Sequence, residues 1–189
     1  MNHTQRVVTG ALATLAALVW AMPAKSQESQ PISEIDHYSA TRLIELGVKP
    51  GLAYTVEATG VPVLDGATIT VDNPCRSDGE FVFYGLYEFD LNLIIMCSNN
   101  IQGHELFTEV FTHEAAHLMQ DCRAGIHNKI LHAGPETYVN GLWRTLDESD
   151  QLNIIENYPE EFWDAETEAY ALEQYPERVE RGLQRFCFH

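Results

Sequence analysis

The hydrophobic pattern of this chain changes at Gly103, and the change limits the folds that the chain can adopt. Before Gly103, four runs rich in β-branched and aromatic residues are separated by Gly and Asp-Asn-Pro, and they predict short antiparallel strands and hairpins: AYTVEATG, ATITVD, EFVFYGLYEF and LNLIIMC. After Gly103, the apolar residues of HELFTEVFTHEAAHLMQDC recur at helical spacing. Strands followed by a helix in this order predict an α+β fold.

Further helices are predicted on both sides of this boundary. The segment IDHYSATRLIELG has helical spacing and ends at Gly47, which is a suitable helix stop. TYVNGLWRTLDESDQLNIIENY predicts one or two helices, and Pro159 and Pro176 each open another, since proline is tolerated in a first turn. We therefore expect an antiparallel or mixed sheet of short strands packed on the helix after Gly103, followed by a helical C-terminal part.

The N-terminal segment has the features of a secretory signal peptide. A short polar start with one positive charge precedes an apolar run over residues 7–24, and Ala24 and Ser26 supply the small residues of a cleavage site. We predict that residues 1–26 are removed and that residues 27–189 form a single domain, which suits their length. An uncleaved membrane anchor is the alternative, although the apolar run is marginal for spanning a membrane.

The chain is strongly acidic. Its formal net charge is −17, and it becomes −19 when the leader is removed with Arg6 and Lys25. This charge repels nucleic acid and anionic membrane surfaces, so we expect no nucleic-acid partner and no stable membrane insertion after cleavage. The acids themselves identify no partner, because a solvated acidic surface gives the same composition.

Four cysteines lie in the exported part of the chain: Cys75, Cys97, Cys122 and Cys187. An even number of cysteines in an oxidising compartment predicts two disulfides. The chain contains no C-x-x-C pair, so a cysteine-rich metal site is disfavoured. Four cysteines allow three pairings, and the sequence does not choose among them.

His113, Glu114 and His117 belong to the motif His-Glu-Ala-Ala-His inside the helix predicted after Gly103. Residues four apart on a helix lie about 40° apart around its axis, so both histidines face the same way and can share a metal ion. Glu114 lies beside them, within reach of a water on the metal. Zinc lowers the pKa of such a water to about 7, and the glutamate can then act as general base. A helix with two histidines and no metal is the alternative.

A catalytic zinc site of this kind needs a third protein ligand. The later segment FWDAETEAYALE offers two carboxylates, those of Glu166 and Glu168. Residues two apart on a helix lie about 200° apart, so only one of the two can face the metal. Both faces of this predicted helix carry apolar residues, so periodicity leaves the choice open.

The combination of HEAAH with the later ETEAYA resembles the gluzincin class of zinc metallopeptidases, and YEFDLNLIIMC resembles the hairpin and edge strand of small secreted bacterial zincin peptidases. In gluzincins the ligand glutamate stands three residues before a small alanine. Glu166 and Ala169 match this spacing, so the resemblance implies Glu166 as the third zinc ligand. The resemblance covers about residues 81–173. The chain departs from it in the 49-residue gap between His117 and Glu166, and in Tyr170, where an acid often stands.

The resemblance implies a zincin-like domain that acts as a secreted or periplasmic zinc peptidase on peptide bonds in proteins or peptides. It also implies that the strand at 91–97 binds an extended peptide along its edge. A side chain that stabilises the transition state is expected as well, with Tyr138, His132 and Tyr170 as candidates. The alternative is an exported, disulfide-braced binding module on a zincin scaffold that no longer cuts, and the intact Glu114 argues against it.

Overall fold

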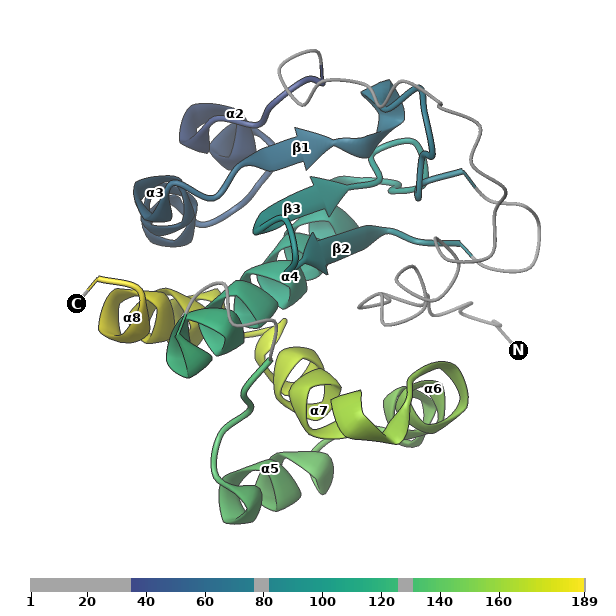
Figure 1. Ribbon diagram of the computed structural model, residues 1–189, viewed down its shortest axis with the longest axis vertical. Coiled ribbons are helices and arrows are strands. Elements are labelled where there is room, and N and C mark those ends of the chain that lie inside the picture. The colour runs from purple at the N-terminus through teal and green to yellow at the C-terminus, as the bar shows by residue number, and fades with distance from the viewer. Residues whose placement is uncertain (1–34, 77–81, 126–130, 189) are drawn as a thin grey trace.

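The computed structural model describes residues 35–76, 82–125 and 131–188 (Figure 1). The predicted signal peptide, residues 1–26, lies outside them. Among the described helices, none is both long and apolar enough to cross a membrane. The elements are α2 (Ala40–Glu45), α3 (Pro50–Thr59), β1 (Val63–Asp65), η2 (Gly66–Thr68), β2 (Gly85–Glu88), β3 (Leu93–Met96), α4 (His104–Ala124), α5 (Glu136–Trp143), α6 (Glu148–Asn157), η3 (Glu160–Phe162), α7 (Trp163–Leu172) and α8 (Pro176–Phe186).

The fold is α+β, as the sequence predicts. Three short strands form a mixed sheet that packs on the long helix α4, and the helices from α5 to α8 follow (Figure 1). The helices predicted outside the β-rich region are confirmed. α2 ends before Gly47, the segment predicted as one or two helices forms α5 and α6, and Pro159 and Pro176 stand at the starts of η3 and α8.

β3 is the central strand of the sheet, whose order is β1-β3-β2. Ile94 of β3 lies opposite Val63 in the parallel pair with β1 and opposite Tyr87 in the antiparallel pair with β2. The expectation that the strand at 91–97 offers an edge to a peptide is therefore wrong, because both of its sides are already paired. Within the described residues, the outer side of β2 is paired with no other strand, so β2 is an edge strand.

The segment AYTVEATG is helical rather than extended. Pro50 occupies the first turn of α3, and Gly60 ends this helix with φ of 80°, in the left-handed region that favours glycine. Leu52, Ala53 and Val56 form its buried face, and α3 packs on α2 and α8. The β-branched residues of this segment raise strand propensity only weakly, and the packing of a buried helical face overrides that preference.

The run ATITVD does not form a strand either. Its first residues belong to the short turn η2, in which the Asp65 side chain accepts a hydrogen bond from the Ala67 amide. The strand β1, just before this turn, was not predicted. The other two runs were placed correctly but are shorter than expected, since β2 covers four residues of EFVFYGLYEF and β3 four residues of LNLIIMC.

Helix α4 lies at the centre of the core. It contacts β2, β3, α7 and α8, so every residue from 110 to 122 is buried. Phe111, Ala115 and Leu118 are among the apolar residues of the main core cluster. The polar residues of the HEAAH motif are carried into the interior by the same helix, where burial without a partner is costly.

Two disulfides are present, as predicted. They join Cys75 to Cys97 and Cys122 to Cys187, and no cysteine is left free. The second bond ties the last turn of α4 to the C-terminal end of α8. Two disulfides indicate that the chain folds in an oxidising compartment outside the cytoplasm.

Candidate metal centre

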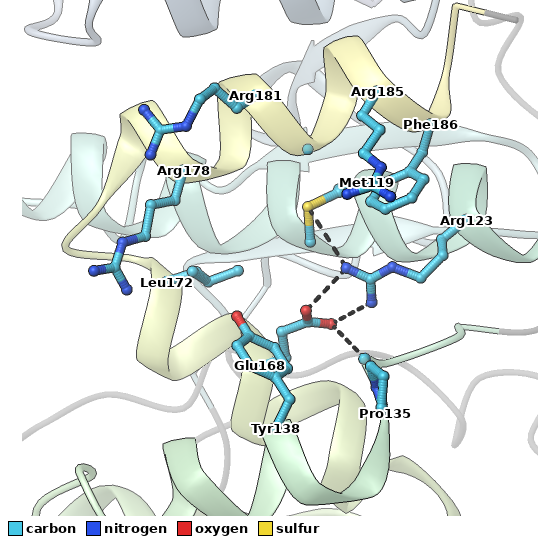
Figure 2. Close-up of a pocket in the computed structure, with 12 residues that line it drawn as sticks. Met119, Arg123, Pro135, Tyr138, Glu168, Leu172, Arg178, Arg181, Arg185 and Phe186 are labelled. Atoms are coloured by element: carbon cyan, nitrogen blue, oxygen red, sulfur yellow. Dashed lines mark hydrogen bonds and ion pairs between the residues drawn. The ribbon is translucent and has the colours of Figure 1, made fainter.

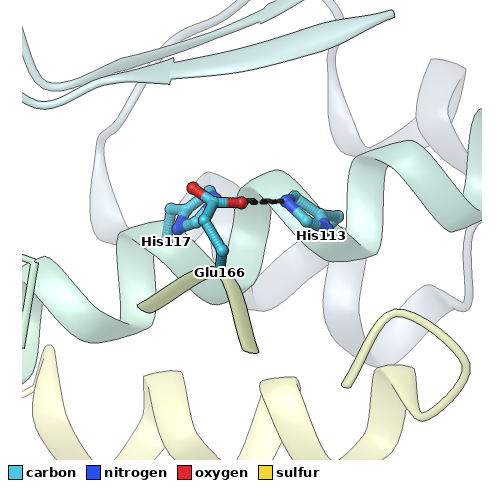
Figure 3. A group of neighbouring side chains, drawn as sticks. All are labelled: His113, His117 and Glu166. Carbon is cyan, nitrogen blue, oxygen red and sulfur yellow. Dashed lines mark hydrogen bonds and ion pairs between the residues drawn. The ribbon is translucent and has the colours of Figure 1, made fainter. Parts of the chain in front are cut away.

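His113 and His117 lie one turn apart on the same side of α4 (Figure 3). Both side chains are fully buried, and their Nε2 atoms are 3.2 Å apart. The two rings are steeply inclined to each other, with centroids 4.9 Å apart. The helix thus brings one nitrogen from each ring to a common point, as the spacing of the motif predicted.

Glu166 reaches the same point from α7, which packs on α4 (Figure 3). Its Oε2 lies 3.4 Å from His113 Nε2, and its Oε1 lies 3.5 Å from His117 Nε2. Neither contact meets hydrogen-bond geometry, and both oxygens are buried without a hydrogen-bond partner. One atom from each of the three side chains can be chosen so that all three lie within 4.8 Å of one another, close enough to hold a metal ion.

The outer nitrogen of each ring has an acceptor that fixes its proton. His113 Nδ1 lies 3.3 Å from Glu173 Oε2, and His117 Nδ1 lies 3.0 Å from Gln120 Oε1. Both partners accept, so each Nδ1 carries a hydrogen, and each neutral ring presents the lone pair of its Nε2 to the common point. Metal-binding histidines are held in this way by carboxylates and other acceptors. The sequence analysis did not identify Glu173 or Gln120 as members of the site.

The three inward-facing groups fit a cation between them. Two nitrogen lone pairs and a carboxylate have no proton to share when both rings are neutral, so without a cation they repel one another. Ligands about 2.05 Å from a tetrahedral zinc ion lie about 3.3 Å apart. The two Nε2 atoms are 3.2 Å apart, and each lies 3.4–3.5 Å from a different oxygen of Glu166.

Without a metal, a proton can take the place of the cation. Burial lowers the pKa of both rings, but the carboxylates of Glu166 and Glu173 raise the pKa of His113 to about 10. The pKa of His117 stays below its ordinary value, chiefly because of burial. Metal ions bind the neutral form of imidazole, so a cation at this cluster would compete with the proton that the two carboxylates favour on His113.

Glu168 faces away from the histidines. Arg123 donates to its two oxygens at 2.8 and 2.9 Å, and Gln120 Nε2 and the Gly134 amide each donate at 3.2 Å. The charge of Glu168 is therefore compensated by an arginine, whereas the oxygens of Glu166 have no hydrogen-bond donor. The structure brings Glu166 rather than Glu168 to the histidines, which is the alternative that the resemblance favoured.

Glu114 lies beside this cluster, where α4 meets β2. Its side chain is fully buried, and neither carboxylate oxygen has a hydrogen-bond partner. Burial raises the pKa of Glu114 to about 8, against the opposing effect of His113. β2 approaches so closely that a Cβ added to Gly85 would lie 3.0 Å from Glu114 Oε1. A buried acid with a shifted pKa and no hydrogen bond of ordinary geometry is characteristic of functional sites.

Of the three side chains expected to stabilise a transition state, only Tyr170 lies at the cluster. Its ring packs edge-on against His113 with centroids 4.8 Å apart, but its hydroxyl accepts a hydrogen bond from Asn153. Tyr138 lines a separate pocket, and His132 is exposed. These two candidates are not brought to the site.

Tyr158 is a neighbour of the cluster that the sequence analysis missed. Its hydroxyl is buried and has no hydrogen bond of ordinary geometry. Burial raises the pKa of Tyr158 well above its usual value, and the nearby carboxylate of Glu166, the hydroxyl of Tyr170 and the carboxylate of Glu114 raise it further. The only local signal in the sequence is the proline that follows Tyr158, and it marks a turn rather than a site.

The chain matches the family model of a domain of unknown function, DUF8637, over residues 68–188. The chain belongs to the DUF8637 family. The matched region contains His113, Glu114, His117 and Glu166, so the whole cluster lies inside the DUF8637 domain. No curated protein and no solved structure matches the chain.

Proposed function

We propose that this protein is an exported zinc-dependent peptidase, with His113, His117 and Glu166 as metal ligands and Glu114 as general base. One observation carries the proposal: three buried Lewis bases converge with one ligand atom each within 4.8 Å of one another, and a buried carboxyl group without a hydrogen bond of ordinary geometry stands beside them. Three protein ligands leave one position open, as in catalytic zinc sites, whereas structural sites are closed by four.

Each residue has a defined task in this proposal. Bound zinc would act as a Lewis acid that lowers the pKa of a water molecule and polarises the peptide carbonyl. Glu114 accepts the proton of the attacking water and later donates it to the leaving amine nitrogen. Burial raises the pKa of Glu114 to about 8, and a value this close to neutrality suits a group that must both take and give a proton. The buried hydroxyl of Tyr158 is a donor for the oxyanion that develops on the carbonyl oxygen.

The edge strand β2 supplies a place for the peptide. Its outer side is unpaired among the described residues, and an extended peptide can add to such an edge through main-chain hydrogen bonds. Gly85 of β2 lies directly against Glu114. A peptide paired to this edge would therefore lie next to Glu114, the proposed general base. β3 cannot hold a peptide in this way, because both of its sides are paired within the sheet.

A second candidate is a non-catalytic zinc-binding module, and one observation favours it. The three ligands and Glu114 are all fully buried, as in a metal site that only stabilises a fold. The unpaired carboxylate of Glu114 argues for catalysis instead, since a purely structural site has no use for a desolvated acid beside three ligands. The two candidates differ in whether the zinc-loaded protein cuts peptides.

Comparison of Glu114→Gln with wild type tests the proposal. We expect the purified mature chain to hold about one zinc ion and to cleave members of a mixed peptide library or an unfolded protein. Glu114→Gln should keep the zinc and lose about 10²–10⁴ in rate. Glu105→Gln, which changes an exposed acid in the first turn of the same helix, should behave as wild type.

Three results would contradict this proposal. A zinc-loaded wild type that cleaves no peptide in the library supports the non-catalytic module. Full activity of Glu114→Gln assigns the general base elsewhere. If the purified protein holds iron and not zinc, the cluster matches the two-histidine, one-carboxylate iron sites of oxygenases, and its chemistry would be that of oxygen and not of hydrolysis.

We further propose that the leader at 1–26 exports the chain to a secreted or periplasmic location, in line with its two disulfides. The strong negative charge of the mature chain disfavours nucleic acid as a partner. Edman sequencing of the secreted protein should find a new N-terminus near Ser26.

A further inference from the structure

A pocket separate from the metal cluster lies where α8 faces α7 and the start of α5 (Figure 2). It has a volume of about 700 Å³ and is lined by residues of α4, α5, α7 and α8 and of the segment before α5. This volume falls within the range of small-molecule sites. Glu168 lines this pocket, whereas Glu166, two residues earlier on α7, points to the histidines.

Four arginines line this pocket: Arg123, Arg178, Arg181 and Arg185. The last three come from α8, where their spacing of three and four residues places them within an arc of about 60° on one face. The whole chain has 11 lysines and arginines against 28 acids. More than a third of its basic side chains therefore gather at one pocket of a strongly acidic protein.

Only one of these arginines is neutralised by the described part of the chain. Arg123 binds the buried carboxylate of Glu168 through two hydrogen bonds. No ion pair joins the three arginines of α8 to any described acidic side chain. Instead, Arg178 lies over the ring of Tyr175 and Arg185 over the ring of Phe186, at 4.4 and 5.3 Å from the ring centroids. Within the part of the chain that the structure describes, these three charges have no acidic partner.

The wall of the pocket is largely apolar below these charges. Met119 of α4, Leu172 of α7 and Phe186 of α8 line it together with Pro135. α8 approaches α4 so closely here that a Cβ on Gly182 would collide with the sulfur of Met119, so this wall is tightly packed. Figure 2 shows the arginines of α8 on one side and Glu168 with Tyr138 on the other.

We propose that this pocket binds a small organic anion that has an apolar body and a dianionic head group, such as a phosphate monoester or a dicarboxylate. Guanidinium groups bind phosphate and carboxylate oxygens through paired, charge-assisted hydrogen bonds. Three unpaired guanidinium groups on one helix face favour a head group with two charges over one with a single charge. The apolar wall receives the body of the ligand. The proposal is independent of the metal cluster, because no metal-cluster residue lines the pocket.

Isothermal titration of the mature protein with phenyl phosphate tests this proposal. We expect saturable one-to-one binding with a dissociation constant of about millimolar, as suits a ligand of this size. Phthalate should bind similarly, because it carries two carboxylates on a ring. Benzoate, with one charge, and inorganic phosphate, with no apolar body, should each bind at least about 10-fold more weakly.

Arginine variants locate the bound anion. Arg181→Gln and Arg185→Gln should each weaken phenyl phosphate binding about 10-fold. Arg144→Gln removes the same charge from an exposed position outside the pocket and should have no effect. The affinity should be equal in zinc-loaded and zinc-stripped protein. The proposal would be overturned if phenyl phosphate showed no saturable binding, or if it bound only in the presence of zinc. Wild-type affinity in both Arg181→Gln and Arg185→Gln would also overturn it.

Discussion

Replacing Glu173 by alanine should weaken zinc binding without unfolding the protein. Glu173 Oε2 lies 3.3 Å from His113 Nδ1, and the Glu173 side chain is 12% exposed. This contact holds the imidazole so that Nε2 faces the common point with Glu166, and the negative charge makes the ring a better ligand. In the variant the ring loses both its orienting partner and this charge.

The size of the effect follows from the geometry. Loss of such a partner lowers metal affinity about 10- to 100-fold, or about 1.4–2.8 kcal/mol. The 3.3 Å distance is longer than a strong charge-assisted hydrogen bond, and the partial exposure of Glu173 screens its charge. We therefore expect a loss of about 10- to 30-fold for Glu173→Ala. Glu173→Gln keeps an acceptor oxygen, so its loss should be smaller, about 3- to 10-fold.

Competition with a chromophoric zinc chelator near neutral pH measures the affinities, and circular dichroism confirms that each variant is folded. Glu177→Ala is the matched control, since Glu177 is an exposed acid in the first turn of α8. It should bind zinc as wild type does. Wild-type affinity in Glu173→Ala, or an equal loss in Glu177→Ala, would refute the argument that this contact orients a metal ligand.

Three other perturbations test separate parts of the structure. Glu166→Gln should weaken zinc binding far more than Glu168→Gln, because only Glu166 faces the histidines; zinc titration showing the reverse order would exclude Glu166 as the ligand. Tyr158→Phe should keep zinc and stability, because the lost hydroxyl makes no hydrogen bond of ordinary geometry, yet lower peptide turnover about 10²–10³-fold. Unchanged turnover would remove Tyr158 from the mechanism. Cys122 and Cys187 are 65 residues apart, so replacing both by serine should lower the free energy of unfolding by about 4 kcal/mol in urea. A loss below about 1 kcal/mol would contradict that loop-entropy argument.

Helices with strong periodicity or proline starts were predictable, and short strands were not. α4 and α8 follow from apolar spacing and first-turn proline, which are local features. α3 was mistaken for a strand because Thr55 and Val56 suggested extension, although Pro50 and Gly60 mark the start and end of a helix. The central position of β3 depends on its parallel pairing with β1, a non-local contact that no sequence pattern in this chain reveals.

The metal cluster was partly predictable, because one part of it depends on local features of the sequence and the rest on non-local contacts. His113 and His117 are four residues apart, so helix geometry alone brings them together. The choice of Glu166 depends on Arg123, which occupies Glu168 from the last turn of α4. The partners of the two rings and the arginine pocket likewise require α7 and α8 to be packed on α4.

X-ray absorption spectroscopy at the zinc edge of the zinc-loaded mature protein tests the central claim most directly. We predict only nitrogen and oxygen neighbours, at about 2.0–2.2 Å, including two imidazoles, with no sulfur. His117→Ala should lose this signal, because the remaining His113 and Glu166 form an incomplete site. A zinc–sulfur distance of about 2.3 Å, or an unchanged spectrum in His117→Ala, would contradict the assignment of zinc to this cluster.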